Sequence, residues 1–165
     1  MMEPEWRTKM REMIKIHEGL RLRPYKCSAG RWTIGYGHNL EARGEAIPKE
    51  ISIRQADDYL DADMRSAEKA CEAHLPYFGA LDHVRRTVLV DMCFNLGING
   101  LRNFKRMGEA IAVGRYTRAS VEMIDSKWAV QVGYRAKRLA WMMAYAKWPE
   151  DLFPPAKTSA RGDFE

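Results

Sequence analysis

Only one short stretch of this chain, residues 31–37, alternates between side chains in the way that a β-strand requires. Trp32, Ile34 and Tyr36 would share one face of that strand. A turn and an extended segment precede it, so residues 20–47 are predicted to form a small hairpin-based sheet. Because a sheet of this size is not stable alone, the fold depends on what the rest of the chain supplies.

The rest of the chain has the periodicity of helices. Apolar side chains recur at three- and four-residue steps over residues 5–17, and Gly19 follows as a C-terminal cap. Ser52 and Gln55 have the spacing of a capping box, which would start a helix over about residues 53–75. Further helices are expected at residues 81–96, 104–113, 116–124 and 134–148.

The chain is therefore expected to be an α+β protein with a single domain over residues 1–165. A helix of about 20 residues spans roughly 30 Å, which is enough to connect two lobes. The expected parts are a small lobe with the sheet (about 18–50), a linking helix (about 53–75), a larger helical lobe (about 76–148, with the N-terminal helix 5–17) and a tail (149–165).

The net charge of +5 favours polyanionic partners such as nucleic acid, an anionic membrane or the bacterial cell wall. Basic residues are spread along the chain with acidic residues between them, so a nucleic-acid partner is not expected. No apolar run approaches the roughly 20 residues needed to cross a bilayer, so stable membrane insertion is not expected. The charged first residues show no secretory signal, which predicts a cytoplasmic protein.

Several chemistries have no matching motif. Cys27, Cys71 and Cys93 have no metal-ligand spacing, and in a reducing compartment the last two are expected to be small core residues. No second histidine completes a zinc motif after His17 and Glu18, and residues 35–37 lack the third glycine of a dinucleotide-binding loop. We therefore expect neither a metal nor a nucleotide cofactor.

Glu18 lies at the carbonyl end of the first predicted helix, where the helix dipole disfavours an anion. This raises the cost of ionisation and suits an acid that must hold its proton near neutral pH. The alternative is a structural ion pair between the two lobes.

A constellation of residues surrounds Glu18. The chain reads Glu18-Gly19-Leu20-Arg21-Leu22, then Tyr25, then Gly30-Arg31-Trp32-Thr33-Ile34-Gly35-Tyr36-Gly37-His38. This pattern resembles the T-even phage lysozyme (endolysin) family, glycoside hydrolase family 24. Its members carry a glutamate at the end of the first helix, an Asp or Cys nine residues later and a Thr six residues after that. Those positions are Glu18, Cys27 and Thr33 here, and the resemblance extends over about residues 5–148.

The resemblance implies a muramidase that cuts the β-1,4 bond between N-acetylmuramic acid and N-acetylglucosamine of bacterial peptidoglycan. The protein is expected to be a monomer. Glu18 would be the general acid, with Cys27 and Thr33 positioning or activating water. In this family an arginine pairs with the glutamate. That pairing favours the ionised form of the glutamate, whereas the helix end disfavours it. The implied supporting residues are Arg135 and His38, the implied substrate-binding residues are Asn39, Phe94 and Asn95, and Met107 and Glu122 would also line the saccharide groove.

Some roles stay open at the level of sequence. Cys27 could be a thiolate base with its pKa lowered by Lys26, a covalent nucleophile, or part of the water pocket; water activation with inversion is the expected mechanism. Thr33 could hold a water or be an ordinary strand residue, and His38 could be a buried structural histidine. Phe94 could be a core residue, and Trp128 is expected to pack rather than to bind sugar.

Three alternatives to a muramidase are a non-catalytic wall-binding relative, a lytic transglycosylase that leaves anhydro ends, and a basic nucleic-acid binder whose binding is sensitive to salt. By the resemblance, the protein would be made in the cytoplasm of a host bacterium and would act on the cell wall after release.

Overall fold

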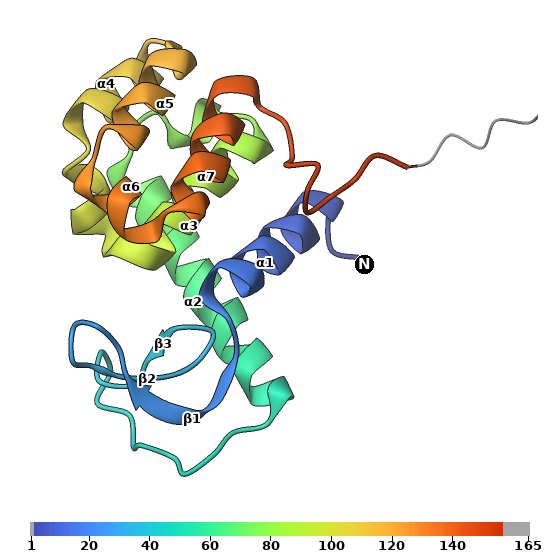
Figure 1. The fold of residues 1–165 in the computed structure, drawn as a ribbon, viewed down its shortest axis with the longest axis vertical. Coiled ribbons are helices and arrows are strands. Elements are labelled where there is room, and N and C mark those ends of the chain that lie inside the picture. The colour runs from blue at the N-terminus through green and yellow to red at the C-terminus, as the bar shows by residue number, and fades with distance from the viewer. Residues whose placement is uncertain (1, 157–165) are drawn as a thin grey trace, which may run out of the picture.

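The computed structural model describes residues 2–156 and has two lobes joined by a long helix (Figure 1). The α+β architecture and the linking helix are confirmed, whereas the end of the predicted tail lies outside the described residues. The elements in chain order are α1 (Glu5–Glu18), β1 (Arg21–Lys26), β2 (Trp32–Gly35), β3 (His38–Asn39), α2 (Ile53–His74), the 3₁₀ turn η1 (Phe78–Ala80), α3 (His83–Arg102), α4 (Lys105–Ala112), α5 (Tyr116–Ile124), α6 (Lys127–Val132) and α7 (Tyr134–Tyr145).

The sheet is antiparallel with the strand order β1-β2-β3. The strand β2 ends at Gly35, two residues before the predicted end, because Gly35 and Gly37 have φ of 65° and 72° and turn the chain into β3. In the register, Thr33 pairs with Tyr25 on one side and with Asn39 on the other. All three of these cross-strand neighbours line one pocket of the molecule.

The linking helix α2 begins as predicted. Ser52 Oγ accepts a hydrogen bond from the backbone N–H of Gln55, and the Gln55 side chain accepts one from the Ser52 N–H. The predicted capping box is therefore confirmed. One face of α2 is buried along its length, through Ala56, Leu60, Met64, Ala67 and Cys71.

The helical lobe differs from the prediction at three places. The helical backbone of α3 is interrupted at Gly97, where φ is 73°, as predicted, but a second helical segment that was not predicted follows the kink and continues to Arg102. The helix α7 ends at Tyr145 rather than at residue 148, because Ala146 adopts a left-handed conformation. The short helix α6 was not predicted, although Ser126 accepts a hydrogen bond from the Ala129 N–H and caps its start.

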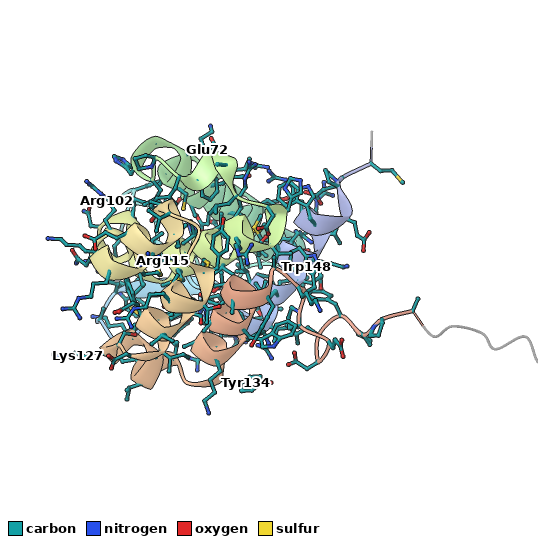
Figure 2. All side chains as sticks on the ribbon, turned by 90° about the horizontal axis from the view of Figure 1, so that it is seen from above. Glu72, Arg102, Arg115, Lys127, Tyr134 and Trp148 are labelled. Carbon is teal, nitrogen blue, oxygen red and sulfur yellow. The ribbon has the colours of Figure 1, made fainter. Side chains whose placement is uncertain are left out.

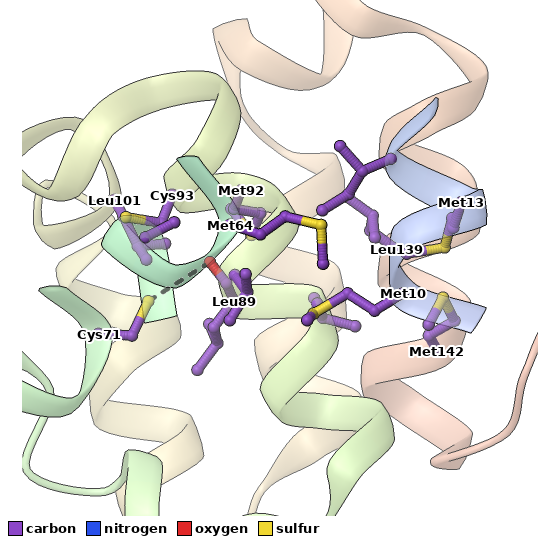
Figure 3. Packing of buried hydrophobic residues seen from close by; sticks show 14 of the residues in the cluster. Met10, Met13, Met64, Cys71, Leu89, Met92, Cys93, Leu101, Leu139 and Met142 are labelled. Carbon is purple, nitrogen blue, oxygen red and sulfur yellow. Dashed lines mark hydrogen bonds between the residues drawn. The ribbon is translucent and has the colours of Figure 1, made fainter. Parts of the chain in front are cut away.

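The core lies where α1, α2, α3 and α7 meet, and methionines fill much of it (Figure 3). Cys71 and Cys93 are buried there, as predicted. Met10 and Met13 come from α1, so the first helix packs into the helical lobe although the sheet follows it directly in the chain. This packing holds the C-terminal end of α1 at the boundary between the lobes (Figure 1).

Candidate active site

A pocket of about 650 Å³ lies between the sheet and the part of α3 next to its kink. It brings together six of the residues selected from the sequence: Glu18, Cys27, Thr33, Asn39, Phe94 and Asn95. The two predicted supporting residues, Arg135 and His38, are buried and do not line this pocket.

Two glycines allow Glu18 to occupy its place. Gly19, with φ of 71°, lets the chain leave α1 directly after Glu18 and enter β1. Gly37 faces the carboxyl group: a Cβ atom at that position would lie 2.7 Å from Glu18 Oε2. The turn between β2 and β3 can therefore approach Glu18 only because residue 37 has no side chain.

The carboxyl group of Glu18 is mostly buried, with 16% of its side chain exposed, and it accepts a hydrogen bond at Oε1 from Arg135 Nη1 at 2.8 Å. Burial raises the pKa of Glu18, and this effect outweighs the lowering by Arg135; the nearby charge of Asp91 raises it further. The sequence left open which of the two opposing influences prevails. In the structure burial prevails, so the pKa of Glu18 lies above its ordinary value.

Arg135 does not serve Glu18 alone. Its Nε donates to Oδ1 of Asp91 at 2.8 Å, and Asp91 is completely buried. Burial would raise the pKa of Asp91, but Arg135 and His17 outweigh it and lower the pKa below its usual value. Since Asp91 neutralises much of its charge, Arg135 stabilises the Glu18 anion less than an undivided guanidinium would.

The chain of contacts continues to the surface. His17 Nδ1 lies 2.7 Å from Asp91 Oδ2, and Arg138 donates to His17 Nε2 at 2.8 Å. Because Nε2 accepts, the ring proton is at Nδ1 and is donated to Asp91. Arg138 also binds Asp151. Sequence reasoning did not select Asp91, although it is the single charged residue in the otherwise apolar run from Val88 to Phe94.

Cys27 lies at the start of the turn that joins β1 to β2, where its carbonyl accepts a hydrogen bond from the Gly30 N–H. Hydrogen bonds from the backbone of Arg31 and, more weakly, of Ala29 lower the pKa of its thiol, and Thr33 acts in the same direction. The predicted cause was Lys26, which is incorrect because the Lys26 ammonium lies over the Trp32 ring instead.

Thr33 is buried in β2, with only 5% of its surface exposed, and its hydroxyl donates to the Arg31 carbonyl at 3.0 Å. A hydroxyl that donates one hydrogen bond keeps its acceptor lone pairs. Thr33 can therefore accept from a water molecule in the pocket while its own rotamer is fixed.

His38 is a buried histidine with both ring nitrogens bound. Nδ1 lies 2.7 Å from Asp63, Nε2 lies 2.7 Å from Glu45, and the ring stacks on Tyr59 of α2. Burial would lower the pKa of His38, but the two carboxylates outweigh it and raise the pKa. The geometry is that of a structural partner that ties the sheet to α2.

The two asparagines of the pocket are held by their side-chain oxygens. Asn39 Oδ1 accepts from the backbone N–H groups of residues 41 and 42, and Asn95 Oδ1 accepts from the indole N–H of Trp128 at 2.8 Å. The NH₂ groups of both amides are thus left for a ligand. Phe94, half-buried, forms an apolar part of the wall.

Two residues expected in the saccharide groove lie elsewhere. Met107 is almost fully buried and Glu122 lies beside it, and both line a different pocket of about 670 Å³ between α4, α5 and α6. Trp128 is 4% exposed and packs edge-on against Phe104, as expected for a packing residue.

Among residues 2–156, no group of three or more His, Cys, Asp or Glu side chains is placed to hold a metal ion. Within the same residues, no helix has the length and the apolar character needed to cross a membrane.

A family model described as phage lysozyme matches residues 15–140. A probable T4-type lysozyme from Dictyostelium discoideum is 24% identical over 79% of this chain and 90% of its own length. An endolysin from Acyrthosiphon pisum secondary endosymbiont phage 1 is 33% identical over 71% of this chain and 75% of its own. The pre-baseplate central spike protein of Enterobacteria phage T4 is 27% identical over 81% of this chain but only 27% of its own length.

Proposed function

Since the chain belongs to the phage lysozyme family, we propose that it is a muramidase that hydrolyses the β-1,4 bond between N-acetylmuramic acid and N-acetylglucosamine in bacterial peptidoglycan. The observation that carries this proposal is the state of Glu18. A desolvated carboxyl with a raised pKa lines an open pocket between two lobes, as glycoside hydrolysis requires of its general acid.

The proposed proton donor is Oε2 of Glu18. Oε1 is occupied by the hydrogen bond from Arg135, whereas Oε2 faces the side-chain-free Gly37. Oε2 gives its proton to the glycosidic oxygen as the bond from that oxygen to C1 of the muramic acid breaks. The carboxylate that is left keeps its hydrogen bond to Arg135, which stabilises the charge as it forms.

Cys27 and Thr33 are proposed to act on the attacking water. Thr33 accepts from the water and holds it, and the thiolate of Cys27 takes a proton from it as the oxygen bonds to C1. Attack from the face opposite to the leaving oxygen gives a product of inverted configuration. Asn39, Phe94 and Asn95 are proposed to bind the glycan, through two free amide NH₂ groups and one apolar face.

The test is to digest purified peptidoglycan and to analyse the released fragments by mass spectrometry and the newly formed ends by proton NMR. Hydrated, reducing N-acetylmuramic acid ends in the α-configuration at first appearance would support inverting hydrolysis. Anhydro ends would identify a lytic transglycosylase, and a β-configuration would identify a retaining enzyme. An absence of released fragments would identify a wall-binding relative and contradict the proposal.

We further propose that the protein acts as a monomer on the wall of the bacterium in whose cytoplasm it is made, after release. The similarity to an endolysin supports this setting. The net charge of +5 would help it to reach the anionic wall, so lysis should slow as salt is added.

The role proposed for the thiol of Cys27 can be tested by substitution. Replacing Cys27 by Asp, which restores an anionic base, should keep most of the activity, whereas Cys27→Ala should lower kcat by about 10²–10⁴-fold. Iodoacetamide should inactivate the wild type, because Cys27 lines the pocket, while the buried Cys71 and Cys93 react far more slowly. Full activity of Cys27→Ala would instead assign this residue to the wall of the water pocket.

Asp91, which shares Arg135 with Glu18, is expected to tune the pKa of the proposed acid. The charge of Asp91 raises the pKa of Glu18, so Asp91→Asn should lower it and leave Arg135 to Glu18 alone. The fall of kcat/KM with rising pH should then begin at a lower pH than in the wild type. Asp58→Asn is the control, since Asp58 is an exposed aspartate on α2 that does not line the pocket and should leave the pH profile unchanged. An unshifted profile in Asp91→Asn would show that Asp91 does not tune the acid.

A further inference from the structure

The outward face of α7 carries three exposed aromatic side chains at helical spacing. Tyr134, Trp141 and Tyr145 are 61%, 38% and 61% exposed. A helix that packs on a core normally presents polar side chains on this face. Figure 2 shows the first of them, Tyr134, projecting from the edge of the molecule. Clustered exposed aromatic groups of this kind mark interaction sites more often than isolated ones do.

Two of these rings line a pocket of about 410 Å³. Its residues come from α7 and from the loop that follows it: Tyr134, Lys137, Arg138, Trp141, Pro149, Glu150 and Asp151. None of them lines the pocket that contains Glu18. Tyr134 and Arg135 are neighbours in the chain, but Arg135 is buried and turned toward Glu18, so α7 separates the two sites.

The pocket is held in shape by its own contacts. Asp151 accepts hydrogen bonds from Arg138 at 2.6 Å and from the Tyr134 hydroxyl at 3.5 Å. The Arg138 guanidinium also lies 4.7 Å from the centre of the Tyr134 ring, and the rings of Trp141 and Tyr145 are 5.6 Å apart. The aromatic surfaces are thus oriented before any ligand arrives, which lowers the entropy cost of binding.

The polar groups of the pocket indicate the chemistry of its ligand. Lys137 and Glu150 form no ion pair within residues 2–156, so one donor and one acceptor are available beside the rings. Aromatic faces for the C–H side of a sugar ring, with charged groups at the edge for its hydroxyls, suit a carbohydrate. The charges of the pocket balance, since Lys137 and Arg138 lie beside Glu150 and Asp151, so it lacks the positive excess that an anionic lipid surface or nucleic acid would require.

We propose that this pocket is a second glycan-binding site, which holds a peptidoglycan strand outside the catalytic pocket. It rests on the proposed function for the identity of the polymer. Binding of the insoluble wall at this second site raises the local concentration of substrate at the catalytic pocket. The second site itself takes no part in bond cleavage.

The test uses the full chain with Glu18→Gln, so that the wall is bound but not digested. Trp141→Ala and Tyr134→Ala are added separately, and binding to purified sacculi is measured by co-sedimentation. Loss of one stacking ring should weaken binding by about three- to tenfold. Val113→Ala is the matched control, because Val113 is an exposed apolar residue (69%) at the end of α4 and should leave binding unchanged.

Rates of hydrolysis, measured on proteins that retain Glu18, complete the test. Trp141→Ala should lower the rate on intact sacculi and leave the rate on short soluble glycan fragments within about twofold, as expected for a site outside the reacting centre. Unchanged binding to sacculi, or equal losses on both substrates, would overturn the proposal. So would a change in sedimentation coefficient or in binding to anionic vesicles without a change on sacculi. If the wild type hydrolysed no wall, the proposed function would fail while the binding comparison still decided the second site.

Discussion

Glu18→Gln is expected to reduce peptidoglycan hydrolysis by about 10²–10⁴-fold while the protein stays folded. The amide has the shape of the protonated carboxyl and can still accept the hydrogen bond from Arg135 at Oε1. It cannot release a proton to the leaving oxygen. The rate of fragment release from purified sacculi, with both proteins at equal concentration, measures the effect.

The same substitution should change how stability depends on pH. Burial raises the pKa of Glu18, so the folded protein binds more protons here than the unfolded chain does between the ordinary pKa and the raised one. The contribution of Glu18 to stability is therefore present at low pH and is lost as the pH rises through this window. Glu18→Gln lacks this loss, and its melting temperature relative to the wild type should increase over the same window.

Glu72→Gln is the control for the loss of a negative charge, because Glu72 is an exposed residue on α2 (Figure 2) that does not line the pocket. It should match the wild type in rate and in stability. A Glu18→Gln protein that kept more than about a tenth of the wild-type rate would contradict the role of Glu18 as general acid, since removing such an acid costs at least about a hundredfold.

The residues closest to the proposed chemistry could be found from the sequence because they lie in one short segment. Glu18 is placed by the end of a periodic helix and Thr33 by the alternation of one strand, and the resemblance to the lysozyme family then selected both. The resemblance also selected Cys27, which lines the pocket, but the lowering of its pKa was attributed to Lys26. The true cause is the backbone of the turn, which has no signature in side-chain order.

The buried support of Glu18 could not be predicted in the same way. His17 and Asp91 are 74 residues apart in the chain, and they meet only because α1, α3 and α7 pack together. The sequence signal was a charged residue in an apolar helix, which indicates a buried partner without naming it. The end of α7 could not be predicted either. Ala146 has a left-handed backbone with φ of 51°, a conformation that an alanine in the sequence does not indicate.

Arg135→Met is expected to lower the free energy of unfolding by about 3–5 kcal/mol near neutral pH. Methionine keeps much of the volume of the arginine but removes the cation that binds Asp91 and Glu18. Asp91 is completely buried and would keep only His17 as a partner. A loss of this size corresponds to a fall in melting temperature of roughly 6–20 °C for a domain of this length, measurable by calorimetry.

The dependence on pH identifies the cause. In the wild type the pKa of Asp91 is lowered, so its contribution to stability is present above the ordinary carboxyl pKa and is lost as the pH falls through the lowered one. Without Arg135, burial is opposed by His17 alone and the pKa should rise, so that stability is lost as the pH increases. The difference between wild type and Arg135→Met should therefore be small in acid and widen toward neutral pH.

Two further proteins separate this explanation from a general effect of removing an arginine. Arg118→Met removes an ion pair with Glu122 from a guanidinium side chain that is 60% exposed, and it should cost less than about 1 kcal/mol. Asp91→Asn combined with Arg135→Met removes the uncompensated charge, so the double variant should be more stable than Arg135→Met alone. If the double variant were instead the sum of the two single losses, Arg135 and Asp91 would stabilise the fold independently. The proposal that Asp91, by sharing Arg135, limits how far this arginine lowers the pKa of Glu18 would then be contradicted.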